Sequence, residues 1–322
     1  MSNLEKYPNV AIIVLNWNDS INTIACVKSL QALQYPHYRI YIIDNNSEDN
    51  SIQEIKKIFP EIDLYNSGSN LGWAGGNNFG IKLAFSHGYN HFYLVNPDIR
   101  VQPETLSALV EAIESDKVGA VGSVVVSHSN PDWIEFAGAA LDKNLGFSRQ
   151  ISMKKSEFIF DGSNVIVPEL KGCSLLITEN GFKGSSFFDE RYFLNYDETD
   201  WCFRTRSKNM ICILAKKSIC FHIGAATFGG TGSPLYRYFI ARNRVLFSKN
   251  NLDKNSFIFA WRCIGWELKS AVFGLSGEKT SIKKKALVII SLLYALRDAA
   301  LGRYGDCPTR VRKINKIFKI VK

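Results

Sequence analysis

The sequence lacks the cysteine spacing of a disulfide-stapled or zinc-bound domain. Its seven cysteines are odd in number, and no two of them form a Cys-X-X-Cys pair. Disulfide frameworks use even numbers of cysteines, and structural zinc sites use closely spaced pairs. The pattern therefore argues against both classes and predicts reduced thiols in a cytosolic protein.

Long apolar runs and a targeting segment are also missing. Residues 10–15 are too short a run for the apolar core of a signal peptide. Residues 286–296 form an apolar run of 11 residues, whereas a helix that crosses a bilayer needs about 20. We therefore expect neither a signal peptide nor a membrane-spanning helix.

A dinucleotide-binding fingerprint is missing as well. The glycine-rich segment Gly72-Trp-Ala-Gly-Gly-Asn77 does not follow the first predicted strand, and no acid lies where a ribose partner is expected. Nicotinamide binding is therefore disfavoured. The glycines do precede a predicted helix, where the backbone can approach a phosphate.

What the chain does contain is a large apolar fraction and an uneven charge. Hydrophobic residues make up 46% of the 322 residues, which supports a substantial core. The net charge is +9, and residues 260–322 hold 14 Lys and Arg against 4 Asp and Glu, so this segment carries +10 and the rest of the chain about −1. We expect a near-neutral body with a basic tail that meets phosphates.

The tail has the composition of helices that lie in a membrane interface. Lys283, Lys284 and Lys285 directly precede the apolar run 286–296, and such lysines bind anionic headgroups. The alternative is a helix pair packed on the preceding domain, and both can hold for different faces. Because no nucleic-acid module is recognisable, we expect no nucleic acid partner, and no obligate protein partner is evident.

Apolar runs and helical patterns alternate over the first 126 residues, which predicts an α/β fold with a doubly wound, mostly parallel sheet. The expected strands are residues 10–15, 40–43, 62–65, 92–95 and 118–126, and the expected helices are residues 21–33, 51–59, 77–87 and 104–114. Further strands are expected at residues 171–177, 211–214 and 218–221, and further helices at residues 200–208 and 234–250.

Polar clusters follow the first four predicted strands. Open α/β sheets bind ligands at the carboxyl ends of their strands, so these clusters should line one crevice. Polar strand-end loops are common, which is the alternative reading. The clusters are Asn16-Trp17-Asn18, Asp44-Asn45-Asn46-Ser47, residues 66–70 and Asn96-Pro97-Asp98.

Two acidic motifs are candidates for chemistry. Asp98 is held in a turn by Pro97, and with His222 and diphosphate oxygens it forms a plausible shell for Mg²⁺ or Mn²⁺. Asn-Pro-Asp as a simple turn is the alternative. Asp197, Glu198 and Asp200 crowd together beside Trp201, which should raise the pKa of one carboxyl into the range of a general base. An acidic helix start is the alternative there.

These motifs, in their order, resemble the inverting family 2 glycosyltransferases over roughly residues 8–250, most closely the rhamnosyltransferase-like members. The likeness rests on residues 10–18, Ile43-Asp-Asn-Asn-Ser47, residues 70–77, Asn96-Pro-Asp98, Phe188-Asp-Glu190, residues 196–204, His222 and Arg242-Asn243-Arg244. The resemblance implies a GT-A fold in which Asp44 reads the nucleobase, Asp98 binds the metal and Glu198 or Asp197 is the base. Two departures are the single acid in Asn-Pro-Asp and the reversed Asp197-Glu198 order.

The resemblance also implies the remaining assignments. Nucleotide-sugar binding falls to Asn16, Asp44, Asn45, Asn70, Gly72, Asn96 and Asp98, and the acceptor side to Asp200, Trp201 and Arg242. Residues 1–254 would form the catalytic domain, with a nucleotide-binding half (1–126) and an acceptor half (127–254), followed by an amphipathic helical tail (255–322).

The function expected from this reading is transfer of a sugar, first of all L-rhamnose, from a dTDP- or UDP-sugar to a lipid-linked or polysaccharide acceptor. The reaction would take place in the cytoplasm, at the inner face of a bacterial plasma membrane, as a step of surface glycan or O-antigen synthesis. The alternative is a non-catalytic, membrane-docked nucleotide-sugar-binding protein. That protein would need neither Asp98 nor Glu198, and both acids are present.

Overall fold

The computed structural model describes residues 7–142, 147–224, 230, 232–273 and 281–320. The chain divides into two compact units, each described below by itself. Unit 1 comprises residues 1–140, 148–188 and 201–224, and unit 2 comprises residues 141–147, 189–200 and 225–322. The boundary expected at residue 254 differs from this division, because the helix that ends at Asn251 belongs to unit 2 together with the tail.

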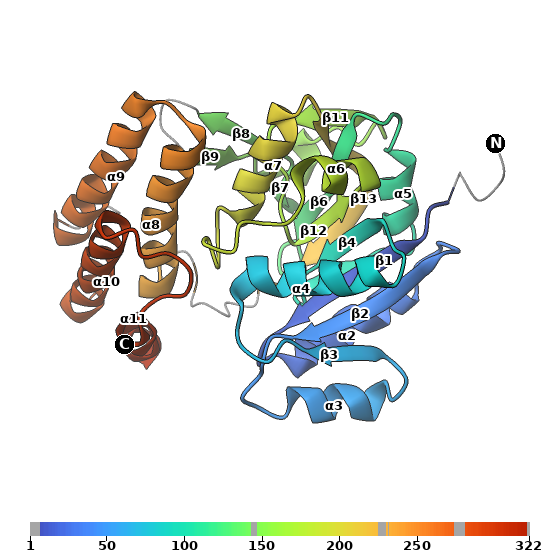
Figure 1. Ribbon diagram of the computed structural model, residues 1–322, viewed down its shortest axis with the longest axis horizontal. Coiled ribbons are helices and arrows are strands. Elements are labelled where there is room, and N and C mark those ends of the chain that lie inside the picture. Colours follow the sequence, from blue (N-terminus) through green and yellow to red (C-terminus); the bar gives the residue numbers. More distant parts are fainter. Residues whose placement is uncertain (1–6, 143–146, 225–229, 231, 274–280, 321–322) are drawn as a thin grey trace. The chain divides into compact units, whose positions relative to one another are not determined.

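Unit 1 is built on a sheet whose first part is parallel, as the alternating pattern predicted (Figure 1). Along this part the order is β4-β1-β2-β3, and the parallel pairing sets Asn16 beside Asp44. The strands are β1 (Val10–Asn16), β2 (Tyr38–Asp44), β3 (Asp63–Asn66) and β4 (His91–Val95). The helices between and after them are α2 (Ser20–Gln31), α3 (Ser51–Ile58), α4 (Gly72–Ser86) and α5 (Thr105–Glu111).

The sheet continues beyond β4 with mixed strand directions. β12 (Ser174–Ile177) lies antiparallel between β4 and β6 (Val118–Ser127). The two short strands expected at residues 211–221 are a single strand, β13 (Ile211–His222), that runs parallel to β6. The other elements of this region are β5 (Ile99–Val101), β7 (Trp133–Phe136), β8 (Ala139–Asp142), β9 (Phe147–Gln150), β10 (Met153–Lys154), η1 (Lys155–Glu157), β11 (Asn164–Val167) and α6 (Glu179–Ser185).

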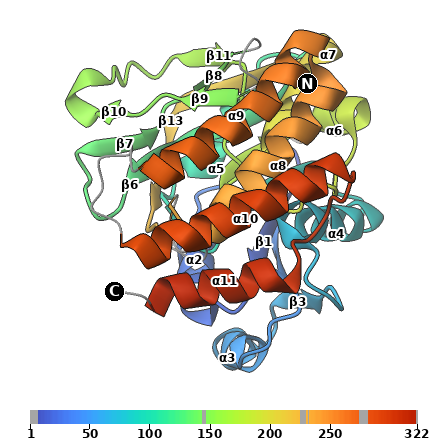
Figure 2. The same ribbon diagram turned by 90° about the vertical axis from the view of Figure 1, so that its left-hand side faces the viewer.

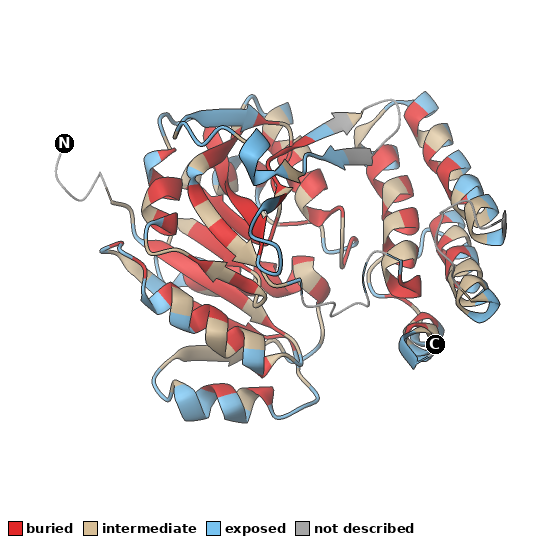
Figure 3. Cartoon of the chain, turned by 180° about the vertical axis from the view of Figure 1, so that it is seen from behind, coloured by how far each residue is buried: buried red, intermediate tan, exposed pale blue. Residues whose placement is uncertain are grey.

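The core of unit 1 follows from the continuous apolar runs of its central strands. Every residue of β1 from Val10 to Val14 is fully buried, and so are Tyr41 to Ile43 of β2. Figure 3 shows these strands as a buried layer beneath helices with exposed outer faces. Strands covered on both faces suit apolar residues at every position, which is why the runs do not alternate with polar residues.

The glycine-rich segment is the first part of α4, and it does not precede the helix as expected. A Cβ added at Gly76 would lie 2.4 Å from a methyl carbon of Leu15, and one at Gly80 would lie 2.6 Å from a methyl carbon of Ile13. These two glycines let α4 approach β1 closely. Their role is therefore helix–sheet packing, while Gly72, with a φ of +71°, provides the turn into the helix.

In the residues that the structure describes, unit 2 contains four long helices that share one apolar core. Ser233 caps α8 by accepting a hydrogen bond from the Tyr236 backbone N–H, and Pro234 occupies the first turn, as predicted. Figure 2 shows α9, α10 and α11 side by side. None of the helices described here is both long and apolar enough to span a membrane. The helices are α8 (Pro234–Asn251), α9 (Lys254–Phe273), α10 (Ile282–Ala300) and α11 (Thr309–Ile320).

Candidate functional site

The polar clusters at the carboxyl ends of β1, β2 and β3 form one hydrogen-bonded row. Asn16 at the end of β1 donates from Nδ2 to Asp44 Oδ1 at 2.8 Å, across the pairing of β1 and β2. Asn66 at the end of β3 donates to Asp44 Oδ2 at 3.0 Å. Ser47 donates to the same carboxylate from its backbone N–H and its hydroxyl. The ends of three adjacent parallel strands are therefore tied together through one carboxylate.

This network gives Asp44 a structural role inside the protein. The side chain is fully buried, and its two oxygens accept four hydrogen bonds from within the protein. A buried carboxylate in a complete set of hydrogen bonds is expensive to disturb. Asp44 therefore organises the strand-end loops, and its contact with a nucleobase stays a prediction.

Asn45 holds the turn that leads into α4. Its Nδ2 donates to Asn70 Oδ1 at 3.2 Å and to the Gly72 carbonyl at 3.0 Å, and its Oδ1 accepts from the Leu71 backbone N–H at 2.9 Å. Asn70 also accepts from the Gly72 N–H. Sequence analysis placed Asn45, Asn70 and Gly72 in the nucleotide-sugar site, and the structure brings them together at the edge where β2 ends.

The Asn-Pro-Asp turn lies between β4 and β5. Asn96 Oδ1 accepts from the indole N–H of Trp73 at 2.9 Å, which ties this turn to α4. The Asp98 carbonyl accepts from the Ile223 backbone N–H at 2.9 Å, and β5 pairs with the end of β13. Asp98 and His222 are thus held side by side by backbone pairing, with His222 Nε2 3.1 Å from Asp98 Oδ2.

Asp98 and His222 have the chemistry of part of a divalent cation site. Asp98 Oδ1 is buried and has no hydrogen-bond partner in the structure, so one hard oxygen donor is free. No group of three or more His, Cys, Asp or Glu among the described residues is arranged to hold a metal. Mg²⁺ commonly binds one or two carboxylates and completes its shell with water and substrate phosphates. The two residues fit a cation that arrives with a diphosphate.

Glu135 of β7 is a neighbour that sequence analysis missed. Its Oε2 lies 2.6 Å from His222 Nδ1, on the other side of the ring from Asp98. Burial by itself lowers the pKa of His222, but hydrogen bonds and charge from Asp98 and Glu135 outweigh it and raise the pKa above its ordinary value. One signal was available in the sequence, since Glu135 is an acid between the strongly apolar Ile134 and Phe136.

The second acidic motif opens α7 (Asp197–Ser207) and begins in unit 2. Asp197 is buried and Oδ1 accepts from the Glu198 backbone N–H at 3.0 Å, whereas Glu198 is half-buried. Burial, and then the charge of Glu198, raise the pKa of Asp197 well above its ordinary value. One carboxyl of the motif therefore has the raised pKa that crowding predicted, and the more accessible carboxyl is its neighbour.

The three residues predicted for the acceptor side are all buried. Asp200 accepts from Tyr192 Oη and Asn251 Nδ2. Trp201 donates to the Ser186 carbonyl and packs against Phe188 in the core of unit 1. The structure thus shows internal contacts for these side chains, and their part on the acceptor side stays a prediction.

A loop with unusual backbone geometry leads into α7. Phe193, Asn195 and Tyr196 have φ values of +64°, +62° and +70°, a region that side-chain-bearing residues rarely adopt. Asn243 of α8 donates from Nδ2 to the carbonyls of Tyr192, Leu194 and Asn195 at 2.8–2.9 Å. Arg242 donates to the Tyr192 carbonyl at 3.1 Å. The Arg-Asn pair thus holds the segment just before Asp197.

A comparison with known families finds a match in the first part of the chain. Residues 11–167 match the model of Glycosyl transferase family 2, so this stretch is similar to members of that family. It contains the hydrogen-bonded row, the Asn-Pro-Asp turn and Glu135, whereas His222 and the acidic motif of α7 lie beyond it.

Individual relatives are distant. The low-salt glycan biosynthesis hexosyltransferase Agl10 of Haloferax volcanii is 22% identical over 207 residues, which are 63% of this chain and 63% of Agl10. The dTDP-rhamnosyl transferase RfbF of Shigella flexneri is 20% identical over 309 residues, 92% of this chain and 99% of RfbF. The match thus spans less than two thirds of Agl10.

A solved structure supports the fold. GalNAc-T7, crystallised with UDP, GalNAc and Mn²⁺, superposes with a TM-score of 0.55 at 14% identity, over 84% of this chain and 58% of that one. The chain therefore has the GT-A fold expected from the sequence, with a mostly parallel central sheet and helices at the carboxyl-terminal end of the chain.

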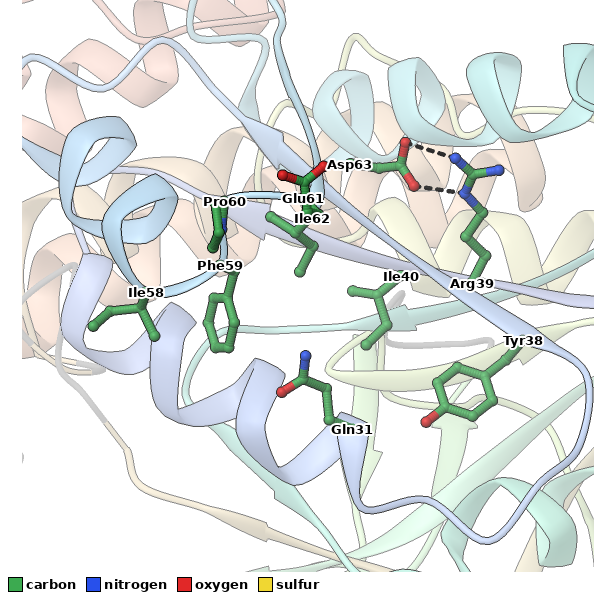
Figure 4. A pocket seen from close by; sticks show the side chains of 10 residues that line it. All are labelled: Gln31, Tyr38, Arg39, Ile40, Ile58, Phe59, Pro60, Glu61, Ile62 and Asp63. Carbon is green, nitrogen blue, oxygen red and sulfur yellow. Dashed lines mark hydrogen bonds and ion pairs between the residues drawn. The ribbon is translucent and has the colours of Figure 1, made fainter.

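A surface pocket of about 600 Å³ in unit 1 lies away from the predicted site residues. It is lined by the start of β2 at Tyr38 and Arg39, the start of β3 at Asp63, and the end of α3 (Figure 4). Arg39 and Asp63 form an ion pair on its rim. Because β2 and β3 are parallel, their starts lie at the edge opposite the hydrogen-bonded row, so this pocket is not the candidate site.

Proposed function

We propose that this protein transfers a sugar from a nucleotide diphosphate donor to an acceptor hydroxyl, with inversion at the anomeric carbon. The observation that carries the proposal is the pairing of Asp98, with its unpartnered oxygen, and His222 beside the hydrogen-bonded row. In open α/β sheets this edge binds nucleotides. The family 2 match over the same strands supports the assignment.

Each group has a part in the proposed reaction. Asn45, Asn70 and Gly72 shape the loop that receives the nucleotide, and Asp44 keeps that loop in place. Asp98 and His222 would hold Mg²⁺ or Mn²⁺, and the bound cation would neutralise charge on the leaving diphosphate. Glu198 or Asp197 accepts the proton of the attacking hydroxyl as it displaces the diphosphate. The Mn²⁺ and UDP in the GalNAc-T7 crystal support this choice of cation and donor class.

For the donor we propose dTDP-rhamnose, with a UDP-sugar as the alternative, and for the acceptor a lipid-linked or polysaccharide glycan of the bacterial surface. The support is the likeness to RfbF, described as a dTDP-rhamnosyl transferase, along nearly the whole of both chains. At 20% identity the chemistry of a sugar pocket can change, so the donor is a question for experiment.

Donor hydrolysis across a panel of nucleotide sugars tests the proposal. The full chain should release nucleotide diphosphate from one donor in the presence of Mn²⁺ or Mg²⁺, and EDTA should stop the release. The Asp98→Asn substitution should also stop the release of nucleotide diphosphate while the protein stays folded, because a neutral amide binds the cation poorly beside a competing diphosphate. Hydrolysis that continues in EDTA would remove the metal from the mechanism, and binding of nucleotide without turnover would favour the non-catalytic alternative.

We also propose that the helices of unit 2 bind the cytoplasmic face of an anionic membrane. One face of α9, α10 and α11 packs into the shared core, so the packing alternative holds for that face. The other face exposes large apolar side chains among basic ones. On α9 these are Ile258, Trp266 and Val272 with Arg262 and Lys269, and on α10 and α11 they are Ile282, Leu293, Ile317 and Ile320 with Lys283, Lys313 and Lys316.

A further inference from the structure

Glu135 occupies a break in the regular pairing of β7 with β6. Ile134 pairs with Val126 and Phe136 pairs with Val125. Val125 and Val126 are consecutive in β6, whereas Glu135 separates Ile134 from Phe136, so Glu135 is one extra residue in β7. This is a β-bulge, which changes the direction of a side chain and recurs next to active sites. Ile134 and Phe136 on either side of it are both buried in the core, so the position of the bulge is firmly held.

The bulge lies two strands away from His222, and the side chains meet. β13 pairs with the opposite edge of β6 from β7, with Phe221 beside Val126 and His222 beside Ser127. Glu135 Oε2 is 2.6 Å from His222 Nδ1, and Asp98 Oδ2 is 3.1 Å from Nε2. All three side chains are largely buried, with 16–26% of each exposed. The imidazole is thus held between two carboxylates from different strands.

We propose that Glu135 is a positioning residue for the cation site: it accepts the hydrogen bond of His222 Nδ1–H and so leaves Nε2 as the nitrogen that binds a divalent cation beside Asp98. Glu135 is not itself a ligand, because it lies on the opposite side of the ring. The inference rests on the cation of the proposed function and assigns a role to a residue outside the predicted motifs.

The physical reason is that a neutral imidazole has one proton and two nitrogens. The nitrogen that carries the proton cannot bind a metal. A hydrogen-bond acceptor beside one nitrogen keeps the proton there and leaves the other nitrogen free for the metal. A carboxylate on Nδ1 keeps the proton there, fixes the orientation of the ring and makes Nε2 a better electron donor. This matters more here than in a site with several protein ligands, because the proposed function assigns the cation to Asp98 and His222 among the described residues.

Binding of Mn²⁺ in the presence of UDP or dTDP, followed by electron paramagnetic resonance of the free ion, tests the proposal without any sugar transfer. Loss of such a partner typically weakens metal binding about 10–100-fold. Glu135→Ala should show a loss in this range, and Glu135→Gln, which keeps an acceptor but no charge, a smaller one. Asp132→Asn is the control, since it removes an equal charge from an exposed position three residues away and should leave the affinity unchanged.

The ring itself provides a second readout. With ¹⁵N-labelled histidine, the wild-type His222 signals should report the proton on Nδ1, and Glu135→Gln should shift the tautomer toward Nε2–H. Unchanged Mn²⁺ affinity in Glu135→Ala, or an unchanged tautomer in Glu135→Gln, would overturn the positioning role while the wild-type titration still showed a cation site. If the wild-type protein binds no Mn²⁺ with either nucleotide, the cation assignment of the proposed function fails together with this inference.

Discussion

Two adjacent acids, Asp197 and Glu198, differ in burial, and this difference favours Glu198 as the general base. Glu198 is the accessible one and matches the base position of the resembling family, whereas Asp197 is buried behind it. Glu198→Gln should therefore reduce kcat by about 10²–10⁴-fold, the usual worth of a positioned base, with little change in donor affinity. Asp197→Asn should reduce kcat less. Steady-state kinetics of both variants measures the two losses of kcat. A larger loss in Asp197→Asn than in Glu198→Gln would make Asp197 the base.

The buried carboxyl of Asp197 should also make stability depend on pH. Because burial raises its pKa, the folded protein keeps this proton after the unfolded chain has released it near the ordinary value of about 3.9. Stability is therefore fully present below that pH and falls as pH rises toward the folded pKa, by at most about 1.4 kcal/mol per pH unit.

Asp197→Asn removes this titration, so the difference between its melting temperature and that of the wild type should shift steadily in favour of the variant as pH rises above about 4, until the pKa of Asp197 in the folded protein is reached. Thermal unfolding at several pH values measures the difference. A constant difference across the range would mean that Asp197 ionises normally in the folded protein.

At the scale of elements, close helix–sheet approaches depend on glycine. A Cβ at Gly181 of α6 would lie 1.9 Å from the Gly119 carbonyl oxygen of β6, and a backbone atom cannot move aside as a side chain does. The Gly181→Ala substitution should lower the free energy of unfolding by about 1–3 kcal/mol or more, because inserting a methyl group into a packed contact costs about this much.

Gly265 of α9 is the matched control, since a Cβ there meets nothing within 4 Å. Gly265→Ala should raise stability by up to about 1 kcal/mol through helix propensity. Calorimetric unfolding compares the two variants. Similar melting temperatures for both would show that the α6–β6 approach relaxes without cost.

The clamp from α8 makes a second prediction at this scale. Asn243→Ala removes three hydrogen bonds to the loop before Asp197. The Tyr192 carbonyl keeps Arg242 as a donor, whereas the Leu194 and Asn195 carbonyls lose the Asn243 donor, and a buried carbonyl left without a partner costs about 1–3 kcal/mol. The variant should lose stability and lose kcat more than donor affinity, because the loop positions the acidic motif. Lys249→Ala, at an exposed position of the same helix, should change neither. An Asn243→Ala protein with normal turnover would show that the loop keeps its shape unaided.

For the whole molecule, the uneven charge should decide where the protein is found. Removing the tail is a poor test, since α8 shares its core with α9, α10 and α11 and would lose its packing. Reversing the exposed Lys269, Lys283 and Lys313 to Glu leaves the core intact. Each lysine near an anionic surface contributes about 1 kcal/mol at low salt, so binding should fall more than about 100-fold.

Sedimentation with vesicles of phosphatidylglycerol and phosphatidylcholine measures this binding. Reversal of Lys28, Lys56 and Lys57 in unit 1 changes the net charge equally and is the control. Equal losses in both triple variants would mean that attraction follows overall charge, and the interfacial face of unit 2 would be rejected.

The sequence by itself determined the strand–helix alternation, the edge of the sheet at which polar residues gather, and the GT-A fold. Apolar periodicity, turn residues and caps are local, so β1 to β4, α2 to α5 and the cap at Ser233 were readable from a few neighbouring residues. The same holds for the candidate pair Asp98 and His222, which short motifs mark.

Only the tertiary structure decided what each polar side chain contacts. Burial and hydrogen-bond partners come from residues far apart in the chain, which is why Asp44, Trp201 and Arg242 could not be recognised as internal groups from their motifs. Likewise β13 is one strand because β6 pairs with it on both sides of the irregularity between Ala215 and Ile219. The bond between Glu135 and His222 joins residues 87 positions apart, and no local pattern specifies a contact that depends on a bulge and two strand pairings.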